Sequence, residues 1–291
     1  LVKGASKGEG LGNQFLSNIR ETNAIIHVLR CYQDENITHV EGSVDPLRDK
    51  EIVDFELQIK DMESLEKRNE KINKYLKTGG NEYKKEFEFI EELIKHLKKG
   101  LSLRDLNIDN ESFEKYLKPL SLLTLKPVLY VCNIDEKLIN NNDQLLTNTV
   151  KHLEKENSKI IVIAAKIEQE INELDSYQDR QVFLNDYGLK ESGTSLLINE
   201  AHKLLNLSTF YTAGEKEVRA WTFVNGSKAP KVAGVIHSDF EKGFIKAEVM
   251  KFDDFDENLS ETKVKEAGKL KTEGKDYTVC DGDIIHFRFN N

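Results

Sequence analysis

The chain has 291 residues, of which 38% are hydrophobic and 32% are charged, and only four are proline. This composition excludes a disordered chain, and the length predicts about two globular domains. The formal net charge of −9 argues against attraction of nucleic acid by the protein as a whole, so any RNA contact has to be local.

The sequence also bears on membranes and on redox state. The longest apolar runs, such as Ala24–Leu29, are far shorter than the roughly 18–20 residues that cross a bilayer, and no charged-then-apolar leader opens the chain. We therefore expect a cytoplasmic protein with no membrane partner. Cys31, Cys132 and Cys280 form no C-x-x-C pair, so we expect buried, reduced thiols rather than a disulfide or a zinc site.

The chain opens with a loop, a helix and a strand. Leu1–Gly12 contains four glycines and predicts a loop. From near Asn13 the apolar residues follow helical spacing as far as Thr22, and Ala24–Leu29 is then a nearly continuous apolar run. Such a run is typical of a parallel strand that is covered on both faces, so this region predicts an α/β fold.

A different periodicity follows. Apolar residues recur at steps of three and four on two segments, which are separated by a break containing Gly79 and Gly80. This heptad spacing predicts two helices packed as an antiparallel hairpin. The predicted contact residues are Ile52, Phe55, Ile59 and Met62 on the first helix, and Tyr83, Phe87, Ile90, Ile94, Leu97 and Leu101 on the second.

The α/β pattern returns after Pro119. It predicts a strand at Val128–Cys132, a helix near Leu145–Glu156 and a second strand at Ile160–Ile163. The hairpin, at residues 51–118, thus interrupts one α/β domain formed by residues 1–50 and 119–206.

Residues 207–291 predict a small α+β domain, because alternating strand patterns are separated by turn signals. A helix is expected after Pro230, and Asp281-Gly282-Asp283 predicts a tight turn. The expected strands are Val218–Val224, Phe244–Val249, Tyr277–Val279 and Ile284–Phe289.

The opening segment is the first part of the chain that resembles a known family. Leu1–Gly12, running on into Asn13–Thr22, resembles the switch II region of Obg-family NTPases, which follows an Asp-x-x-Gly motif that senses the γ-phosphate and its magnesium ion. Glycines allow large dihedral changes, so such a segment can close on a γ-phosphate and relax after it leaves. A flexible glycine-rich loop is the alternative. The implied switch residues are Gly4, Ala5, Ser6, Gly8, Gly10 and Gly12.

The resemblance also places Leu1 where many signalling GTPases carry a water-orienting glutamine. A hydrophobic side chain cannot position a water molecule, so hydrolysis would need another group, and the catalytic residue stays unassigned. The alternative is that Leu1 packs in the core.

A second motif, Asn133-Ile134-Asp135-Glu136, follows the strand Val128–Cys132, at the end where ligands of open α/β sheets bind. It resembles the Asn-Lys-x-Asp motif with which GTPases recognise guanine, with Ile134 in place of lysine and Glu136 in place of aspartate, as in YchF-like proteins. The extra methylene of Glu136 displaces the carboxylate and weakens guanine selection. Asn133 keeps an amide that can pair with the N6 donor and N7 acceptor of adenine. An ordinary polar turn is the alternative.

A third motif supports the interpretation of Asn133–Glu136 as a base-binding segment. Ala164-Ala165-Lys166 ends the strand Ile160–Ile163 and resembles the Ser-Ala-Lys motif, whose backbone N–H groups meet the base. The implied nucleotide-binding residues are Asn133, Ile134, Glu136, Ala164, Ala165 and Lys166.

The phosphate-binding motif G-x-x-x-x-G-K-[ST] does not occur in the 291 residues. The resemblance places that motif, and with it the magnesium ligands, upstream of Leu1. We therefore expect no metal ligand in this chain, and no nucleotide hydrolysis by these residues alone.

Residues 207–291 resemble a TGS domain, the β-grasp module of threonyl-tRNA synthetases and stringent-response enzymes, which implies contact with the ribosome or RNA. A candidate RNA patch comprises Lys228, Lys231, Lys242 and Lys246, with solvated surface lysines as the alternative. His237 and Asp239 lack further ligands and predict no metal site. The matching residues lie in Val218–Trp221, Ala229-Pro230, Val235–Phe244, Gly274–Tyr277 and Asp281–Phe287.

The order of these features resembles the YchF (Obg-like ATPase) family. That resemblance implies an α/β fold in which a P-loop NTPase (Ras-like) domain, N-terminally incomplete, carries an inserted antiparallel coiled-coil hairpin and a C-terminal β-grasp (TGS) domain. It implies an ATPase that uses Mg²⁺ with ATP to switch ribosome binding, that contacts ribosomal RNA through the TGS domain and hairpin, and that has no DNA partner. The alternatives are an Obg-type GTPase and a non-catalytic ribosome- or RNA-binding fragment.

Overall fold

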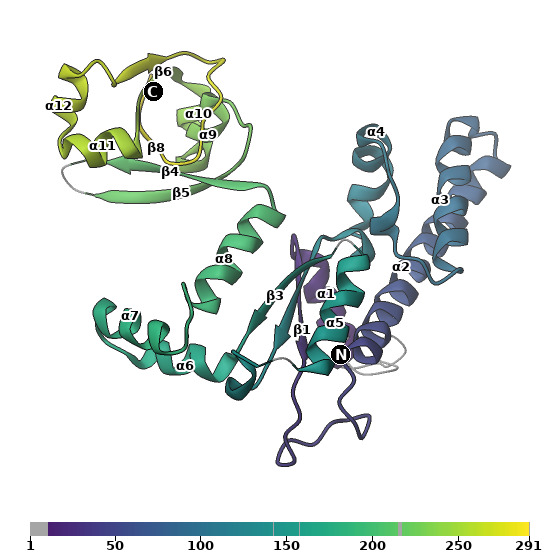
Figure 1. Ribbon diagram of the computed structural model, residues 1–291. Helices are drawn as coiled ribbons and strands as arrows, with labels where there is room; N and C mark the ends of the chain where they lie inside the picture. The colour runs from purple at the N-terminus through teal and green to yellow at the C-terminus, as the bar shows by residue number, and fades with distance from the viewer. Residues whose placement is uncertain (1–10, 142, 157, 215–216, 291) are drawn as a thin grey trace. The chain divides into compact units, whose positions relative to one another are not determined.

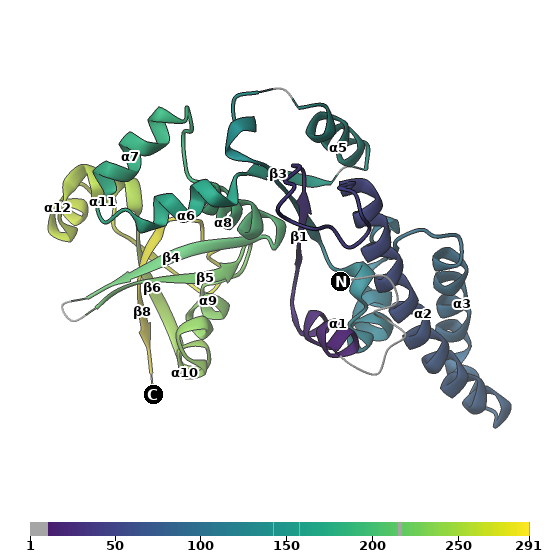
Figure 2. The ribbon, with the colours of Figure 1, turned by 90° about the horizontal axis from the view of Figure 1, so that it is seen from below.

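The computed structural model describes residues 11–141, 143–156, 158–214 and 217–290 (Figures 1 and 2). The chain divides into two compact units, Leu1–Ala201 and His202–Asn291. Helices alternate with parallel strands in the first unit, whereas the second combines helices with a mostly antiparallel sheet. The predicted mixture of helices and sheets is therefore confirmed.

Within the described residues, the first unit contains a parallel sheet, two long helices and several shorter ones. Its strands are β1 (Ile25–Arg30), β2 (Val128–Asn133) and β3 (Lys159–Ile163). Its helices are α1 (Leu11–Glu21), α2 (Pro46–Lys77), α3 (Lys84–Leu97), α4 (Asn110–Ser112), α5 (Gln144–Lys155), α6 (Ala165–Glu173), α7 (Tyr177–Asp186) and α8 (Gly193–Leu204), the last of which crosses into the second unit. Short 3-10 or π turns are η1 (Asn81–Tyr83), η2 (Leu103–Asp105), η3 (Phe113–Leu117), η4 (Lys118–Leu120), η5 (Leu123–Leu125) and η6 (Glu136–Leu138).

The strands are parallel and lie in the order β1-β2-β3. The central strand β2 is buried on both faces, and helices α5, α6 and α7 pack against one of them. The prediction that Ala24–Leu29 is likewise covered on both faces is wrong for the described residues. Ile26 and Val28 are 46% and 60% exposed, because β1 is an outer strand of the described sheet and this side of it is uncovered there.

Helix α1 begins at Leu11, so the prediction of a loop through Gly12 is wrong by two residues. The first helical turn has N–H groups without intrahelical partners and needs no apolar side chain, so the apolar spacing starts later, at Phe15. Leu16 of α1 is buried against Leu57 of α2 and Leu123, which fixes α1 to the root of the long helices.

Helices α2 and α3 lie side by side, run in opposite directions and form an arm that extends away from the sheet (Figures 1 and 2). The turn between them includes Gly79, whose φ of +98° lies in the region that favours glycine. Leu65 and Ile72 of α2 pack against Ile90 and Ile94 of α3.

The predicted contact residues are right for most of α3 and wrong for most of α2. Phe55 is 58% exposed, and Leu101, which is 46% exposed, lies beyond the end of α3. Two of the buried positions in the row of α2 that faces its neighbours are polar and form hydrogen bonds, so a pattern of apolar residues alone pointed to a neighbouring side of the helix. The buried residues in the contact row of α2 are Leu57, Asp61, Leu65, Asn69 and Ile72.

A polar cluster holds the root of the arm together. The buried carboxylate of Asp61 accepts hydrogen bonds from the backbone N–H of Leu123 (2.8 Å) and from the N–H and hydroxyl of Thr124 (both 2.7 Å). Arg20 of α1 donates to Ser64 Oγ (2.8 Å) and to the carbonyl of Leu120 (3.1 Å). The end of α1 is therefore bonded both to α2 and to the segment that returns from the arm.

The second unit contains, within its described residues, one five-stranded sheet in the order β5-β4-β8-β6-β7. Strands β4 and β8 are parallel, and the other pairs are antiparallel. Helix α9 packs on one face, with Val232 and Ala233 against Phe210 and Ile285. The elements are β4 (Leu207–Ala213), β5 (Val218–Val224), β6 (Phe244–Lys251), β7 (Lys271–Glu273), β8 (Asp283–Phe289), α9 (Ala229–Ile236), α10 (Ser238–Lys242), α11 (Phe252–Asn258) and α12 (Glu261–Glu266).

The predicted strand Tyr277–Val279 is wrong, because Thr278 makes only an isolated bridge to Lys228. The buried carboxylate of Asp283 instead draws this segment into a turn, accepting hydrogen bonds from the Tyr277 hydroxyl (2.8 Å) and the Cys280 N–H (2.9 Å). The tight turn before β8 is confirmed, with Gly282 at a φ of +78°.

Candidate functional site

The predicted switch residues are mostly outside the described part of the chain. Leu1, Gly4, Ala5, Ser6, Gly8 and Gly10 lie outside the described residues, whereas Gly12 lies in the first turn of α1. The remaining predicted site residues all lie at the carboxyl ends of β2 and β3.

Asn133 is the last residue of β2 and pairs in register with Ile163, the last residue of β3. Its side-chain oxygen accepts a hydrogen bond from the backbone N–H of Ala165 (3.1 Å), the first residue of α6. Within the described residues its Nδ2 donates no hydrogen bond. Two chain segments that follow neighbouring strands are thus joined through one amide, which keeps its donor for another group.

The next residues of the motif divide into buried and exposed ones. Ile134 and Ala164 are each 6% exposed and belong to the core beside β2. Glu136 begins the turn η6, and its carboxylate lies 2.9 Å from Lys166 Nζ. This ion pair raises the pKa of Lys166, so the two charges stabilise each other across the two segments.

A cavity of about 350 Å³ lies beside the Asn133–Glu136 motif, lined by residues that follow β1 and β2. Tyr32 is an aromatic residue in this lining, and Arg30 fixes the backbone that carries it by donating to the carbonyls of Tyr32 (3.1 Å) and Asp34 (3.2 Å). The position of Tyr32 one residue after Cys31, at the end of an apolar strand, was the signal that could have found it. The lining residues are Cys31, Tyr32, Gln33, Asp135, Lys137, Leu138, Asp143 and Leu145.

The cysteines differ from one another. Cys31 and Cys132 are fully buried, and a hydrogen bond between their thiols together with burial raises the pKa of Cys31, which therefore stays protonated. Cys280 is exposed, so the expectation of a buried thiol is wrong there, because the turn before Asp283 places it at the surface.

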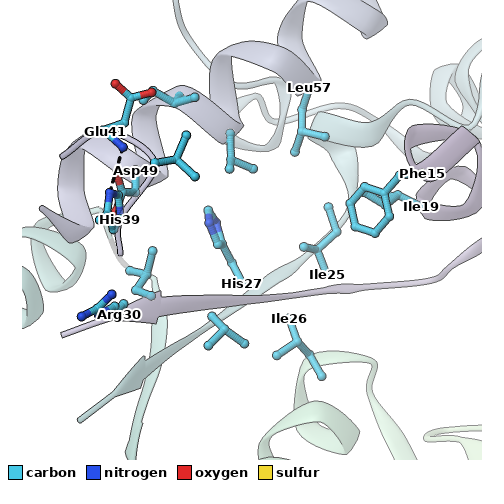
Figure 3. Close-up of a pocket in the computed structure, with 15 residues that line it drawn as sticks. Phe15, Ile19, Ile25, Ile26, His27, Arg30, His39, Glu41, Asp49 and Leu57 are labelled. Carbon is cyan, nitrogen blue, oxygen red and sulfur yellow. Dashed lines mark hydrogen bonds and ion pairs between the residues drawn. The ribbon is translucent and has the colours of Figure 1, made fainter. Parts of the chain in front are cut away.

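A second cavity, of about 370 Å³, lies between α1, β1 and the start of α2 and contains none of the predicted site residues. Figure 3 shows Ile25 and His27 extending from β1 into it, with His39 and Asp49 paired at one side (2.8 Å). The lining is mainly apolar, with Phe15 and Leu57 among its residues. This cavity therefore offers few groups for recognition of a polar ligand.

His27 predicts a pH dependence of stability. Burial lowers its pKa from 6.5 to about 4, with Lys50 acting in the same direction and Asp54 against it. Between these two pH values the unfolded chain binds a proton at His27 and the folded protein does not. The contribution of the neutral His27 to the free energy of unfolding is therefore complete above pH 6.5 and is lost as the pH falls toward 4. We expect a loss of about 3 kcal/mol in the free energy of unfolding between pH 7 and pH 4.

The measurement is urea unfolding at both pH values, followed by far-UV circular dichroism, on the wild type and on His27→Phe. The phenylalanine ring keeps the contact with Tyr130, whose ring centroid lies 5.4 Å from that of His27. The variant should lose about 3 kcal/mol less than the wild type between the two pH values. An equal loss in both proteins would show that His27 does not carry this dependence.

The described residues offer neither a metal site nor a membrane-spanning helix. No group of three or more His, Cys, Asp or Glu side chains there is placed to hold a metal ion. His237 Nδ1 instead accepts from the Asp239 N–H (3.3 Å) at the start of α10. No helix in the described part of the chain is long and apolar enough to cross a membrane.

Three of the four lysines of the candidate RNA patch in the second unit have intramolecular partners. Lys228 Nζ donates to the carbonyl of Asp276 (2.6 Å) and to Thr278 Oγ1 (2.8 Å). Lys231 and Lys246 lie 3.9 and 3.4 Å from carboxylates. The two carboxylates offset part of the charge of the patch, and the hydrogen bonds of Lys228 occupy donors that a phosphate would need.

Comparison with known proteins gives a consistent result. A family model named YchF-GTPase_C and described as a protein of unknown function (DUF933) matches residues 207–290. The ribosome-binding ATPase YchF of Bacillus subtilis is 47% identical over 292 residues, which span this whole chain and 79% of that protein. The protein of the same name from Escherichia coli O157:H7 is 46% identical over 291 residues, with the same coverage of both chains.

A solved structure agrees with the sequence relatives. The structure of the Schizosaccharomyces pombe YchF GTPase matches 97% of this chain and 76% of its own chain, with a TM-score of 0.84 and 34% sequence identity. Similarity at this level, from end to end of the chain and in both sequence and structure, does not arise from a shared fold alone. The chain therefore belongs to the YchF family.

Proposed function

We propose that the protein is a cytoplasmic P-loop ATPase whose nucleotide state controls its binding to ribosomes. In this proposal residues 1–50 and 119–206 form part of a Ras-like NTPase domain, residues 51–118 form an inserted coiled-coil hairpin, and residues 207–291 form a TGS domain. The names of the relatives support it, since the Bacillus subtilis and Escherichia coli proteins are called ribosome-binding ATPases.

The observation that carries the proposal is the arrangement around Asn133. Its amide stands at the carboxyl end of the central strand, which is where ligands of open parallel sheets bind. The side-chain oxygen accepts from Ala165 with one lone pair and keeps the other, while Nδ2 remains a donor. An amide with one acceptor and one donor position matches the N6 and N7 groups of adenine.

The ion pair between Glu136 and Lys166 supports adenine over guanine. Guanine recognition in GTPases needs a carboxylate that accepts from two donors on the base. Here the Glu136 carboxylate is already paired with an ammonium group at 2.9 Å. A guanine ring would have to compete with Lys166 for that carboxylate, whereas adenine needs only the amide of Asn133.

Tyr32 would supply an aromatic wall for the base. It lines the cavity that Asp135 and Lys137 also line, so a ring entering beside the Asn133 motif meets the tyrosine on the side of β1. Base–aromatic stacking contributes roughly 1–3 kcal/mol per base in nucleic-acid complexes.

Two contacts support coupling between the nucleotide and distant parts of the chain. Helix α1 directly follows the proposed switch, and Arg20 at its end is bonded to the arm through Ser64 and Leu120. Helix α6 begins at Ala165, and its Glu168 accepts from the Gly193 N–H (2.6 Å) at the start of α8, which leads into the second unit. Ordering of the switch by ATP would therefore reach the arm through α1, and binding of the base at Asn133 would reach α8 through α6.

Magnesium is part of the proposal only as the partner of ATP. The described residues contain no cluster that could hold it, so no step within them is assigned to the ion. The groups that bind the phosphates, and the group that orients the attacking water, are likewise not assigned to these residues.

The test is competitive calorimetric titration of the full-length protein with non-hydrolysable analogues of ATP and GTP. We expect ATP to bind more tightly, and the double change Glu136→Asp with Ile134→Lys to move the preference toward GTP by about tenfold or more, because a bidentate base contact is worth roughly 1–3 kcal/mol. Lys151→Gln, a change at an exposed residue on α5, should leave the preference unchanged. A wild-type preference for GTP would refute the adenine assignment.

A GTPase is the second candidate, because the Schizosaccharomyces pombe relative of known structure is titled a GTPase. The same titration separates the two candidates. A phosphate-release assay on the full-length protein then distinguishes an enzyme from a binding protein, because binding without turnover would support a non-catalytic role.

A further inference from the structure

The far end of the arm is basic in an otherwise acidic chain. Residues 71–85, here called the arm tip, contain five lysines and a single acidic residue, Glu82, whereas the whole chain has a net charge of −9. Helix α2 places this tip roughly 48 Å from its own start, given a rise of about 1.5 Å per residue over 32 residues. All five lysines are exposed; they are Lys71, Lys74, Lys77, Lys84 and Lys85.

Most of these lysines form no ion pair with a carboxylate of the described residues. Among the described residues only Lys84 of the five lies near a carboxylate, that of Glu88 at 3.9 Å, and both of those side chains are more than 60% exposed. Lys71, Lys74 and Lys77 follow one another at steps of three, so they lie along one side of α2. Their charges remain available to a partner.

The arm tip also carries a pair of stacked tyrosines. The rings of Tyr75 and Tyr83 lie 5.2 Å apart between centroids, at an interplanar angle of 24°, and Tyr75 is 52% exposed. Tyr75 of α2 and Tyr83, the last residue of η1, thus form a small aromatic platform, with lysines before and after it in the sequence.

Backbone hydrogen bonds hold this platform in place. The carbonyl of Tyr75 accepts from the N–H of Thr78 and of Gly80, both at 3.0 Å, and from the Thr78 hydroxyl at 2.9 Å. A Cβ on Gly80 would lie only 3.1 Å from both the Tyr75 carbonyl and the Tyr83 ring. A side chain at this position would therefore crowd both tyrosines, so the glycine lets the turn pack closely against them.

We propose that the arm tip binds RNA, with its lysines on backbone phosphates and Tyr75 stacked on an unpaired base. Ammonium groups on flexible stems suit a row of phosphates, and a half-exposed aromatic ring suits a base that has left its helix. An acidic peptide would match the charge but offers no flat group for the platform. This inference names a surface for the proposed ribosome contact and rests on that part of the proposed function.

The test measures binding of a fluorescently labelled RNA stem-loop, with an unpaired loop, to the full-length protein by anisotropy at several salt concentrations and without nucleotide. Changing Lys71, Lys74, Lys77 and Lys85 to glutamine should weaken binding at least about tenfold and lower the salt slope by about 3, at roughly 0.7–0.9 per phosphate contact. The matched control changes four exposed lysines outside the tip in the same way, at Lys95, Lys99, Lys151 and Lys159, and should have little effect.

A second pair of variants tests the platform. Tyr75→Ala should weaken binding of the stem-loop about tenfold without changing the salt slope, and Tyr75→Phe should restore it. Equal losses in the tip and control variants would overturn the proposal. So would unchanged RNA binding with a loss of binding to polyglutamate, which would make the partner an acidic protein. The RNA-binding assay contains no nucleotide. Its result can therefore be interpreted even if the ATPase assignment is wrong.

Discussion

Replacing Asp61 with alanine is expected to lower the free energy of unfolding of the first unit by about 3–5 kcal/mol, because three buried donors lose their acceptor. Asp61 is fully buried, and burial raises its pKa while the hydrogen bonds from Thr124 and Leu123 oppose that shift. Removal of the carboxylate leaves two backbone N–H groups and one hydroxyl without their acceptor. Each buried donor that loses its partner costs roughly 1–3 kcal/mol, so the packing of the arm on its root should weaken.

The two units can be followed separately in this experiment. Trp221 is the single tryptophan of the chain and lies in β5 of the second unit, so its fluorescence reports on that unit. Far-UV circular dichroism reports mainly on the helices, many of which lie in the first unit. We expect Asp61→Ala to move the dichroism transition to lower urea and to leave the Trp221 transition in place.

Thr124→Val is the matched control for Asp61→Ala. It removes the hydroxyl but keeps the carboxylate and both backbone hydrogen bonds, so about 1 kcal/mol should be lost. If Asp61→Ala unfolds at the same urea concentration as the wild type, the proposed role of this carboxylate at the root of the arm is wrong.

The arm shows where prediction from sequence reaches its limit. On α3, Ile90, Ile94 and Leu97 are apolar and buried, so their spacing alone identified the contact side. On α2, the same row passes through Asp61 and Asn69, whose burial depends on partners far away in the sequence. Asp61 is held by residues more than 60 positions later, and no local pattern contains that information.

The strands likewise could be predicted where an apolar pattern marks them, and were missed where they depend on polar residues or on pairing. β2 was predicted because Val128–Cys132 is an unbroken apolar run, as expected for a central parallel strand. β4 was missed because Ser208 occupies one of its buried positions, which breaks the apolar alternation. β7 has three polar residues and exists only through pairing with β6.

The candidate site was predicted only in part for a similar reason. The position of Asn133 after a strand, and of Ala165 after the next, could be inferred because parallel strands bring their carboxyl ends to one edge. The pairing of Glu136 with Lys166, 30 residues apart, and the place of Tyr32 in a cavity with Asp135 depend on how the loops pack. The roles of these residues stay predictions.

Asn133→Ala is expected to weaken ATP binding to the full-length protein by roughly 10–100-fold, since a bidentate contact with adenine is worth about 1–3 kcal/mol. The change also removes the acceptor for the Ala165 N–H, which frees the segment after β3. Asn133→Ala should weaken the binding of GTP less than that of ATP, because guanine presents an acceptor where adenine presents its N6 donor.

Asn133→Asp separates these two contributions. An aspartate keeps an oxygen for the Ala165 N–H but has no N–H to give to adenine N7, so the loop stays in place while the base contact is lost. If the amide contacts the base, Asn133→Asp should bind the ATP analogue about as weakly as Asn133→Ala in calorimetric titration. If Asn133 only holds the loop, Asn133→Asp should bind nearly as well as the wild type, and the base would have to be recognised elsewhere.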